Sequence, residues 1–206
     1  MTGRRLLPCA FALATVVMAS VACGPSAPKS GPEVRRALSE MVLSCTAEGS
    51  LILLAQAVPS ATLVPCVENY PPGWLLDGVP VVRSGFGQFT LTSDIAGPRA
   101  VSVTLTRTCD VGDAISQNDL GAPGTRRWFE FLHPPSFEAG YDLLQYYVFE
   151  GGCVTYHYTF QPGTPGTFVA EVDSSLGFVR RVEVAEFVRE EFGQTLCGPP
   201  PNTCSP

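Results

Sequence analysis

Charged residues are scarce in this chain of 206 residues. Asp, Glu, Lys and Arg make up 16% of the sequence, whereas soluble domains average about 25%. Acidic residues predominate, and the formal net charge is −6. An acidic chain does not suit a nucleic-acid-binding protein, because such a protein needs cations that displace phosphate counterions. Hydrophobic residues make up 45% of the chain, which is enough to bury the core of one ordinary domain.

Metal-binding and catalytic motifs are also missing. The chain has two His, no C-x-x-C pair and no Cys/His pair at ligand spacing, so the sequence predicts no structural zinc site. It contains no G-x-S-x-G elbow, no S-x-x-K, no phosphate loop and no H-E-x-x-H. The sequence therefore assigns no catalytic residue, no metal ligand and no cofactor.

The two histidines are weak candidates for catalysis. His133 precedes Pro134-Pro135, which is typical of a loop residue. His157 shares one face of a predicted strand with Thr155 and Thr159. A half-buried side chain with a hydrogen-bond partner is the ordinary interpretation of His157, and a catalytic role is the alternative.

Acidic residues offer two further patterns. The stretch 110–119 gathers oxygen ligands of the kind that calcium takes, but its spacing matches no calcium loop and favours a solvated loop within the polar segment 110–124. Glu130, Glu138 and Glu150 could supply paired carboxylates for glycoside hydrolysis. Any acidic chain offers such pairs, so they indicate nothing specific.

The first 22 residues read as a signal peptide. Arg4 and Arg5 precede a short apolar centre at residues 10–18, and small residues follow it. A retained transmembrane helix is the alternative, since no charge appears between Arg5 and Lys29. Pro8 and the Ala/Ser content make the segment a poor membrane anchor.

Cys23 is the candidate lipidation site. The preceding Ala19–Ala22 resembles a bacterial lipobox, although Ser20 stands where an apolar residue is usual. Cleavage without lipid, which would release a secreted protein, remains the alternative. Residues 23–44 would form a small, Pro-rich tether and a short helix over 30–43, and residues 45–206 a single domain. We expect this domain on the outer face of the cytoplasmic membrane.

Residues 143–160 read as the central hairpin of that domain. Two aromatic and β-branched runs meet at Gly151-Gly152, a strong hairpin signal. Other expected strands cover residues 51–58, 62–67, 86–92, 100–106, 125–132 and 167–172, and a helix is expected over 178–192 with Gly193 at its end. The predicted fold is α+β: a mostly antiparallel sheet of about five to seven strands with a C-terminal helix packed on it.

Six cysteines remain after the leader and Cys23 are set aside. An even number in an exported chain indicates disulfides. Six cysteines allow fifteen connectivities, and the sequence does not choose among them. Proximity along the chain gives Cys197–Cys204 as the simplest pair, after which Cys45–Cys66 and Cys109–Cys153 follow.

Four tyrosines occupy the hairpin: Tyr146, Tyr147, Tyr156 and Tyr158. Alternate strand positions face opposite ways, so some of these rings would pack under a helix. The others could form an exposed aromatic ledge for a ligand or partner, and both interpretations stay open.

Several strings resemble a family of exported or membrane-attached actinobacterial proteins whose activity is uncharacterised. They are residues 55–66, 93–94 with 99–101, 123–127, 151–156 and 175–179. The resemblance spans roughly residues 51–188 and implies an envelope context, with no catalytic residue or cofactor to carry over. The leader, the cysteines and the lack of catalytic motifs together predict an envelope lipoprotein that acts as a binding or interaction domain. The competing class is a secreted or membrane-anchored hydrolase.

Overall fold

The computed structural model describes residues 48–78, 80–117 and 124–198. Within them the chain forms three helices and ten strands. The α+β class predicted from the sequence is confirmed, and the strands outnumber the five to seven expected. The leader, Cys23, the tether and the helix predicted over 30–43 lie outside the described residues.

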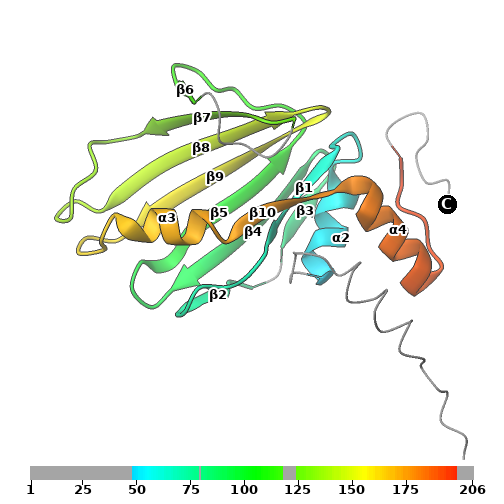
Figure 1. The fold of residues 1–206 in the computed structure, drawn as a ribbon, viewed down its shortest axis with the longest axis horizontal. Coiled ribbons are helices and arrows are strands. Elements are labelled where there is room, and N and C mark those ends of the chain that lie inside the picture. The colour runs from blue at the N-terminus through cyan, green and yellow to red at the C-terminus, as the bar shows by residue number, and fades with distance from the viewer. Residues whose placement is uncertain (1–47, 79, 118–123, 199–206) are drawn as a thin grey trace, which may run out of the picture.

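Eight strands form one antiparallel sheet in the order β2-β4-β5-β9-β8-β7-β6, with β3 also paired to β4 (Figure 1). Their bounds are β2 (Trp74–Leu76), β3 (Val81–Arg83), β4 (Phe86–Ser93), β5 (Gly97–Thr106), β6 (Ile115–Gln117), β7 (Arg126–Phe131), β8 (Tyr141–Phe149) and β9 (Gly152–Phe160). The strands expected over 86–92, 100–106 and 125–132 are therefore confirmed. The segment 110–124, predicted as a loop throughout, contains β6, because Ile115 to Gln117 pair with β7.

The β8–β9 hairpin lies in the middle of this sheet, as predicted. Its turn is Glu150-Gly151, and Gly152 already belongs to β9. Gly151 has a φ of +72°, and a Cβ there would lie 1.8 Å from the carbonyl oxygen of Ser60. Only glycine suits both demands. The hydroxyl of Ser60 in turn donates to the Gly151 carbonyl at 2.7 Å.

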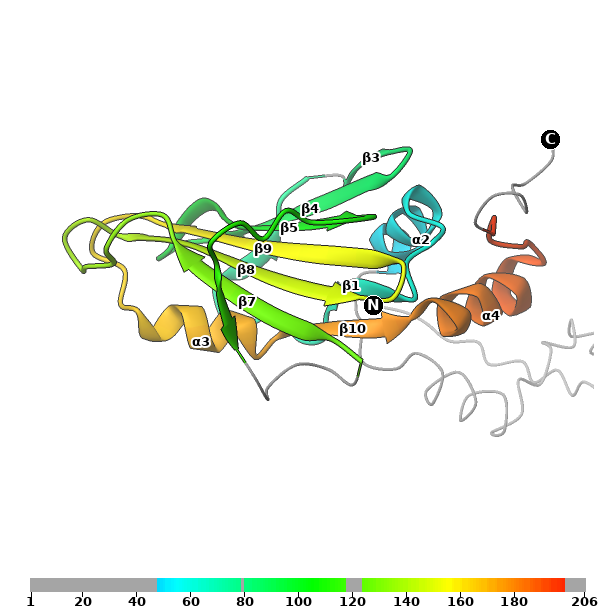
Figure 2. The same cartoon turned by 90° about the horizontal axis from the view of Figure 1, so that it is seen from above.

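A second layer covers one face of the sheet. It consists of α3 (Thr167–Asp173) and a two-stranded antiparallel sheet of β1 (Leu63–Val67) and β10 (Leu176–Arg180). Figure 2 shows α3 and β10 following one another beneath the large sheet. Phe178 of β10 packs against the hairpin, with ring centroids 5.4 Å from Tyr147 and 6.2 Å from Tyr156.

The segment 51–58 was predicted as a buried strand, but residues 51–57 instead belong to helix α2 (Glu48–Ala57), and Val58 directly follows it. Leu54, Ala55 and Val58 are buried, whereas 40% of Leu53 is exposed. This is the one-sided burial of a helix. In a run of eight residues whose only polar member is Gln56, periodicity does not distinguish a buried strand from a buried helix. The helix lies close to β4, since a Cβ on Gly87 would come within 2.6 Å of Leu54 Cδ2.

Two C-terminal predictions need correction. Residues 167–172 form α3 rather than a strand, because Phe168, Val169 and Val172 give one apolar side at helical spacing. The helix expected over 178–192 begins only at Arg181, since residues 176–180 pair with β1 as β10. This helix, α4 (Arg181–Phe192), contacts α2 and β10, so the C-terminal helix that packs on the large sheet is α3. Gly193 ends α4 with a φ of +63°, as predicted.

The disulfide between Cys109 and Cys153 forms as predicted, with Cα atoms 5.7 Å apart. Cys66 and Cys197 are disulfide-bonded too, and their expected partners Cys45 and Cys204 lie outside the described residues. In the part of the chain that the structure describes, no helix is long and apolar enough to cross a membrane.

Candidate functional site

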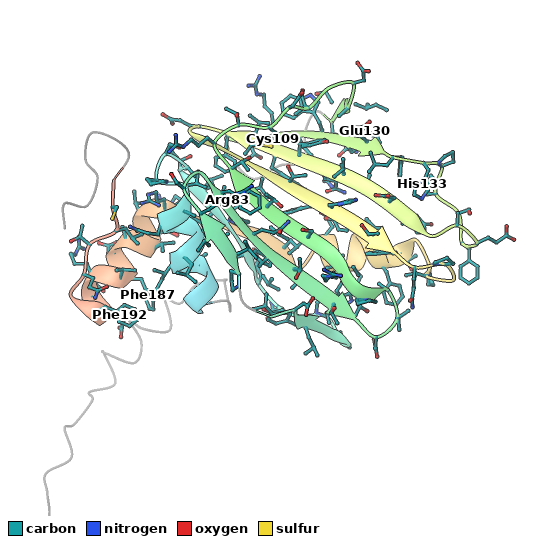
Figure 3. The ribbon with its side chains drawn as sticks, turned by 180° about the vertical axis from the view of Figure 1, so that it is seen from behind. Arg83, Cys109, Glu130, His133, Phe187 and Phe192 are labelled. Carbon is teal, nitrogen blue, oxygen red and sulfur yellow. A yellow bond between two sulfur atoms is a disulfide. The ribbon has the colours of Figure 1, made fainter. Side chains whose placement is uncertain are left out.

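The two faces of the large sheet differ in character. We call the side toward α3 and β10 the covered face, and strand alternation places three hairpin tyrosines on it: Tyr147, Tyr156 and Tyr158. We call the opposite side the threonine face, and Figure 3 shows it with Glu130 and His133 labelled. The threonine face carries Thr90, Thr92, Thr104, Thr155, His157 and Thr159.

A polar network lies within the covered face. Arg127 of β7 donates from Nη2 to Gln145 Oε1 at 2.6 Å and to Asp173 Oδ2 at 3.1 Å. Its guanidinium carbon lies 5.2 Å from the ring centroid of Tyr147. Only 13% of the Arg127 side chain is exposed. Register explains the convergence, because Arg127 lies opposite Tyr147 and Gln145 lies opposite Tyr156.

The three phenols differ in their partners. Tyr158 donates to Asp173 Oδ1 at 2.8 Å, and Tyr147 donates to Gln145 Oε1 at 3.3 Å. Tyr156 is 1% exposed, and its hydroxyl has no hydrogen-bond partner among the described residues. The Nε atom of Arg127 is likewise buried without one. Buried polar groups are satisfied in the great majority of cases. Among the described residues one further buried side-chain atom, Trp74 Nε1, lacks a partner, so two of the three such atoms lie here.

Burial keeps these phenols neutral. It raises the pKa of Tyr156 and of Tyr158 well above the ordinary value of 10.0, and the charge of Asp173 adds to the effect. The pKa of Tyr147 is raised by burial first and by Asp173 second. Each hydroxyl can therefore donate a hydrogen bond at neutral pH.

Two cavities meet at the Arg127–Asp173 ion pair. One, of about 390 Å³, lies toward α3 and is lined in part by Tyr141, Leu143 and Val169. The other, of about 290 Å³, is lined by Arg127 and Tyr156, the two residues that carry these unpartnered atoms, and we call it the polar pocket. Its lining is Glu68, Arg127, Tyr147, Tyr156, Asp173, Leu176, Gly177 and Phe178. Its size is near the lower end of small-molecule sites.

Glu68 closes one side of the polar pocket. It directly follows β1, where its backbone N–H donates to Ser175 O at 2.8 Å. Its side chain lies over Gly177, since a Cβ there would come within 2.3 Å of Glu68 Oε1. The charge of Glu68 also contributes to raising the pKa of Tyr156.

The predicted candidates for catalysis lie elsewhere, on or beside the threonine face. His157 Nε2 lies 2.7 Å from Asp142 Oδ1, and His133 Nδ1 lies 3.8 Å from Asp142 Oδ2. The hydroxyl of Thr159 also approaches His157 Nε2, at 3.3 Å. A catalytic triad divides its partners between the two ring nitrogens, whereas here the carboxylate and the hydroxyl share one. The arrangement fits the half-buried, hydrogen-bonded histidine expected for His157.

The remaining acidic candidates do not converge. Glu130 belongs to β7, Glu138 to the following loop and Glu150 to the hairpin turn. In the 110–119 stretch, Asp110 Oδ1 accepts from the backbone of Gly112 at 3.1 Å, while residues 118 and 119 lie outside the described part. No group of three His, Cys, Asp or Glu among the described residues is arranged to hold a metal ion.

Of the two interpretations of the hairpin tyrosines, packing under the second layer is confirmed for three of them, and no exposed aromatic ledge forms from the four. Tyr147, Tyr156 and Tyr158 all pack on the covered face, and Tyr146, on the other side, is only 8% exposed. Sequence reasoning missed Arg127, Gln145, Asp173 and Glu68. The usable signal was Arg127 and Gln145 at polar positions within otherwise apolar strands, whereas nothing local marked Asp173 or Glu68.

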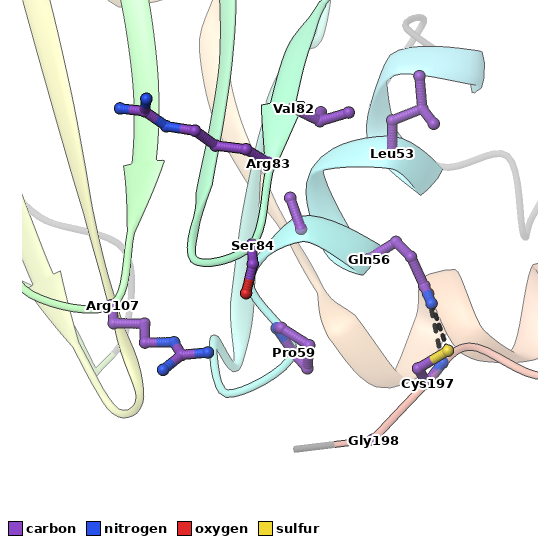
Figure 4. A pocket seen from close by; sticks show the side chains of 10 residues that line it. Leu53, Gln56, Pro59, Val82, Arg83, Ser84, Arg107, Cys197 and Gly198 are labelled. Atoms are coloured by element: carbon purple, nitrogen blue, oxygen red, sulfur yellow. Dashed lines mark hydrogen bonds between the residues drawn. The ribbon is translucent and has the colours of Figure 1, made fainter. Parts of the chain in front are cut away.

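A further cavity, of about 430 Å³, lies between α2, the β3–β4 turn and residues 197–198. Figure 4 shows Arg83 and Arg107 on one side of it and Leu53 and Gln56 on the other. None of the buried, unpartnered polar atoms found in the described residues belongs to its lining. It is therefore a weaker candidate than the polar pocket.

No family model, curated protein or solved structure matches this chain. The function must therefore be argued from the geometry above.

Proposed function

We propose that this chain is an exported envelope lipoprotein whose globular domain binds a small ligand in the polar pocket. The observation that carries the binding role is the pair of buried groups without partners, the Tyr156 hydroxyl and Arg127 Nε. An unsatisfied buried group costs about 1–3 kcal/mol. A bound ligand that accepts from Arg127 and pairs with Tyr156 would recover that free energy.

Binding is favoured over hydrolysis by the distribution of chemical groups. The polar pocket is lined by phenols, carboxylates and a guanidinium, and the only histidines of the chain lie on or beside the other face of the sheet. Neutral phenols and an ion-paired arginine recognise a ligand well, but they lack an activated nucleophile.

A screen of small polar metabolites against the purified domain tests the binding role. Compounds that raise the melting temperature are then titrated by calorimetry against the wild type, Tyr156→Phe and His157→Gln. We expect at least one compound to lose tenfold or more in affinity in Tyr156→Phe. His157→Gln is the matched control on the threonine face and should bind normally. A hit that depends on His157 instead, or a screen without hits, would contradict the proposal.

The envelope location rests on the leader and on disulfide chemistry. Disulfides such as Cys109–Cys153 persist in oxidising compartments. We propose Cys23 as the lipid anchor, which places the domain on the outer face of the cytoplasmic membrane, with secretion after simple cleavage as the alternative. No nucleic-acid partner is proposed.

Fractionation of cells carrying the wild type and Cys23→Ser tests the anchor. A diacylglyceryl group holds a protein on a membrane, whereas one acyl chain binds only marginally. The wild type should sediment with membranes, and Cys23→Ser should be released. A wild type found in the culture medium, or a Cys23→Ser chain that stays bound after its leader is cleaved, would contradict lipidation.

A further inference from the structure

Three aromatic rings line the polar pocket: Tyr147, Tyr156 and Phe178. The ring centroids of Tyr147 lie 5.1 Å from Tyr156 and 5.4 Å from Phe178, and those of Tyr156 and Phe178 are 6.2 Å apart. The faces of aromatic rings carry negative electrostatic potential. A cluster of such rings attracts a cation, and quaternary ammonium groups are commonly bound in this way.

The charged residues that line the polar pocket include one carboxylate without a positively charged partner among the described residues. Arg127 and Asp173 form an ion pair at 3.1 Å, so their charges offset each other. Glu68 also lines the pocket, and no hydrogen bond or ion pair of its carboxylate is found among the described residues. The pocket therefore carries about one uncompensated negative charge, which disfavours an anionic ligand.

The two buried atoms without partners add a second requirement. Arg127 Nε–H can only donate, so the ligand needs an acceptor. The Tyr156 hydroxyl can donate or accept, and its raised pKa keeps it protonated at neutral pH. A polar oxygen on the ligand would pair with either group.

We propose that the polar pocket binds a small organic cation that carries an oxygen acceptor, of the class represented by choline and ethanolamine. This inference rests on the proposed binding function and names the ligand class of the same site. The cationic group lies against the rings beside Glu68, and the oxygen lies toward Arg127 Nε and the Tyr156 hydroxyl. A cavity of about 290 Å³ suits a ligand of this size.

Gly177 provides a way to move the carboxylate without changing its charge. A methyl group on this residue would displace the Glu68 carboxylate, since the Cβ would come within 2.3 Å of Oε1. If Glu68 recognises the cation by position, Gly177→Ala should weaken binding even though every charged group remains.

Calorimetric titration with choline chloride and with its uncharged isostere 3,3-dimethylbutan-1-ol tests the ligand class, and ethanolamine serves as the smaller cation. We expect the wild type to bind at least one of the two cations at least tenfold more tightly than the isostere. Glu68→Gln should remove that preference, and Gly177→Ala should reduce it. His157→Gln, on the threonine face, should leave it unchanged.

Each other outcome overturns the proposal. If the isostere binds as tightly as the cations and is lost in Tyr156→Phe, the pocket takes neutral ligands, and the binding function stands without the cation. If neither cation binds while other metabolites bind in a Tyr156-dependent way, the ligand class is wrong and the function stands. If no compound of any kind binds, the proposed function fails together with the ligand class.

Discussion

The two faces of the large sheet each carry one aspartate whose side chain is 23% exposed, yet the surroundings of these two residues differ. Asp173, at the end of α3, joins Arg127, whose side chain is 13% exposed, to the Tyr158 hydroxyl. Asp142, at the start of β8, pairs with His157, whose side chain is 38% exposed. The two carboxylates are therefore equally exposed, but the partners of Asp173 are more deeply buried than the partner of Asp142. On the covered face the partners are desolvated, so a buried polar group without a partner costs free energy. Two of the three such side-chain atoms among the described residues belong to residues that line the polar pocket.

Alkaline pH should have the largest effect on stability, and the effect comes from the buried phenols of the covered face. The pKa values of Tyr147, Tyr156 and Tyr158 are raised by burial, so these phenols stay protonated in the folded state while the unfolded chain ionises near pH 10. The unfolded state then binds fewer protons, and stability falls as pH rises above 10. The free energy of unfolding should then fall by about 1.4 kcal/mol per pH unit for each phenol. For the three phenols together the slope is about 4 kcal/mol per pH unit.

Absorbance at 295 nm across an alkaline titration measures this directly. Three of the six tyrosines should ionise only when the circular dichroism signal of the fold is lost. Ionisation of all six before unfolding would show that the covered face admits water and hydroxide.

Replacing the two aspartates compares the faces with the same chemical change. Asp173→Ala leaves Arg127 and the Tyr158 hydroxyl without their partner and should lower the free energy of unfolding by about 2–4 kcal/mol. Asp142→Ala removes a more exposed pair and should cost about 1 kcal/mol or less. Urea denaturation of both variants measures the difference, and equal losses would refute the contrast between the faces.

Much of the fold could be predicted from sequence because local chemistry decided it. Alternation of apolar and polar residues placed β4 and β5, and the Gly pair placed the β8–β9 hairpin. Where long-range packing determined the secondary structure, the prediction from sequence was wrong. Residues 51–57 form a helix that buries one side, and residues 176–180 form a strand that pairs with β1.

The candidate site could be predicted only in part for the same reason. The hairpin tyrosines were identified, but whether they were covered depended on α3 and β10, which lie beyond the hairpin in sequence. Asp173 is 46 residues from Arg127 along the chain, and Glu68 is farther still. No local pattern brings such residues together, so the pocket required the tertiary structure.

The proposed site depends on a Tyr156 hydroxyl that is buried without a partner among the described residues until a ligand binds. The most direct measurement is the free energy of unfolding of Tyr156→Phe beside Tyr158→Phe, both without ligand. Tyr156→Phe removes an unsatisfied hydroxyl and should raise the stability by about 1 kcal/mol, whereas Tyr158→Phe loses a bond to Asp173 and should lower it by about 1–2 kcal/mol. A loss of stability in Tyr156→Phe as large as that in Tyr158→Phe would contradict the account, because the hydroxyl would then have a partner in the free protein.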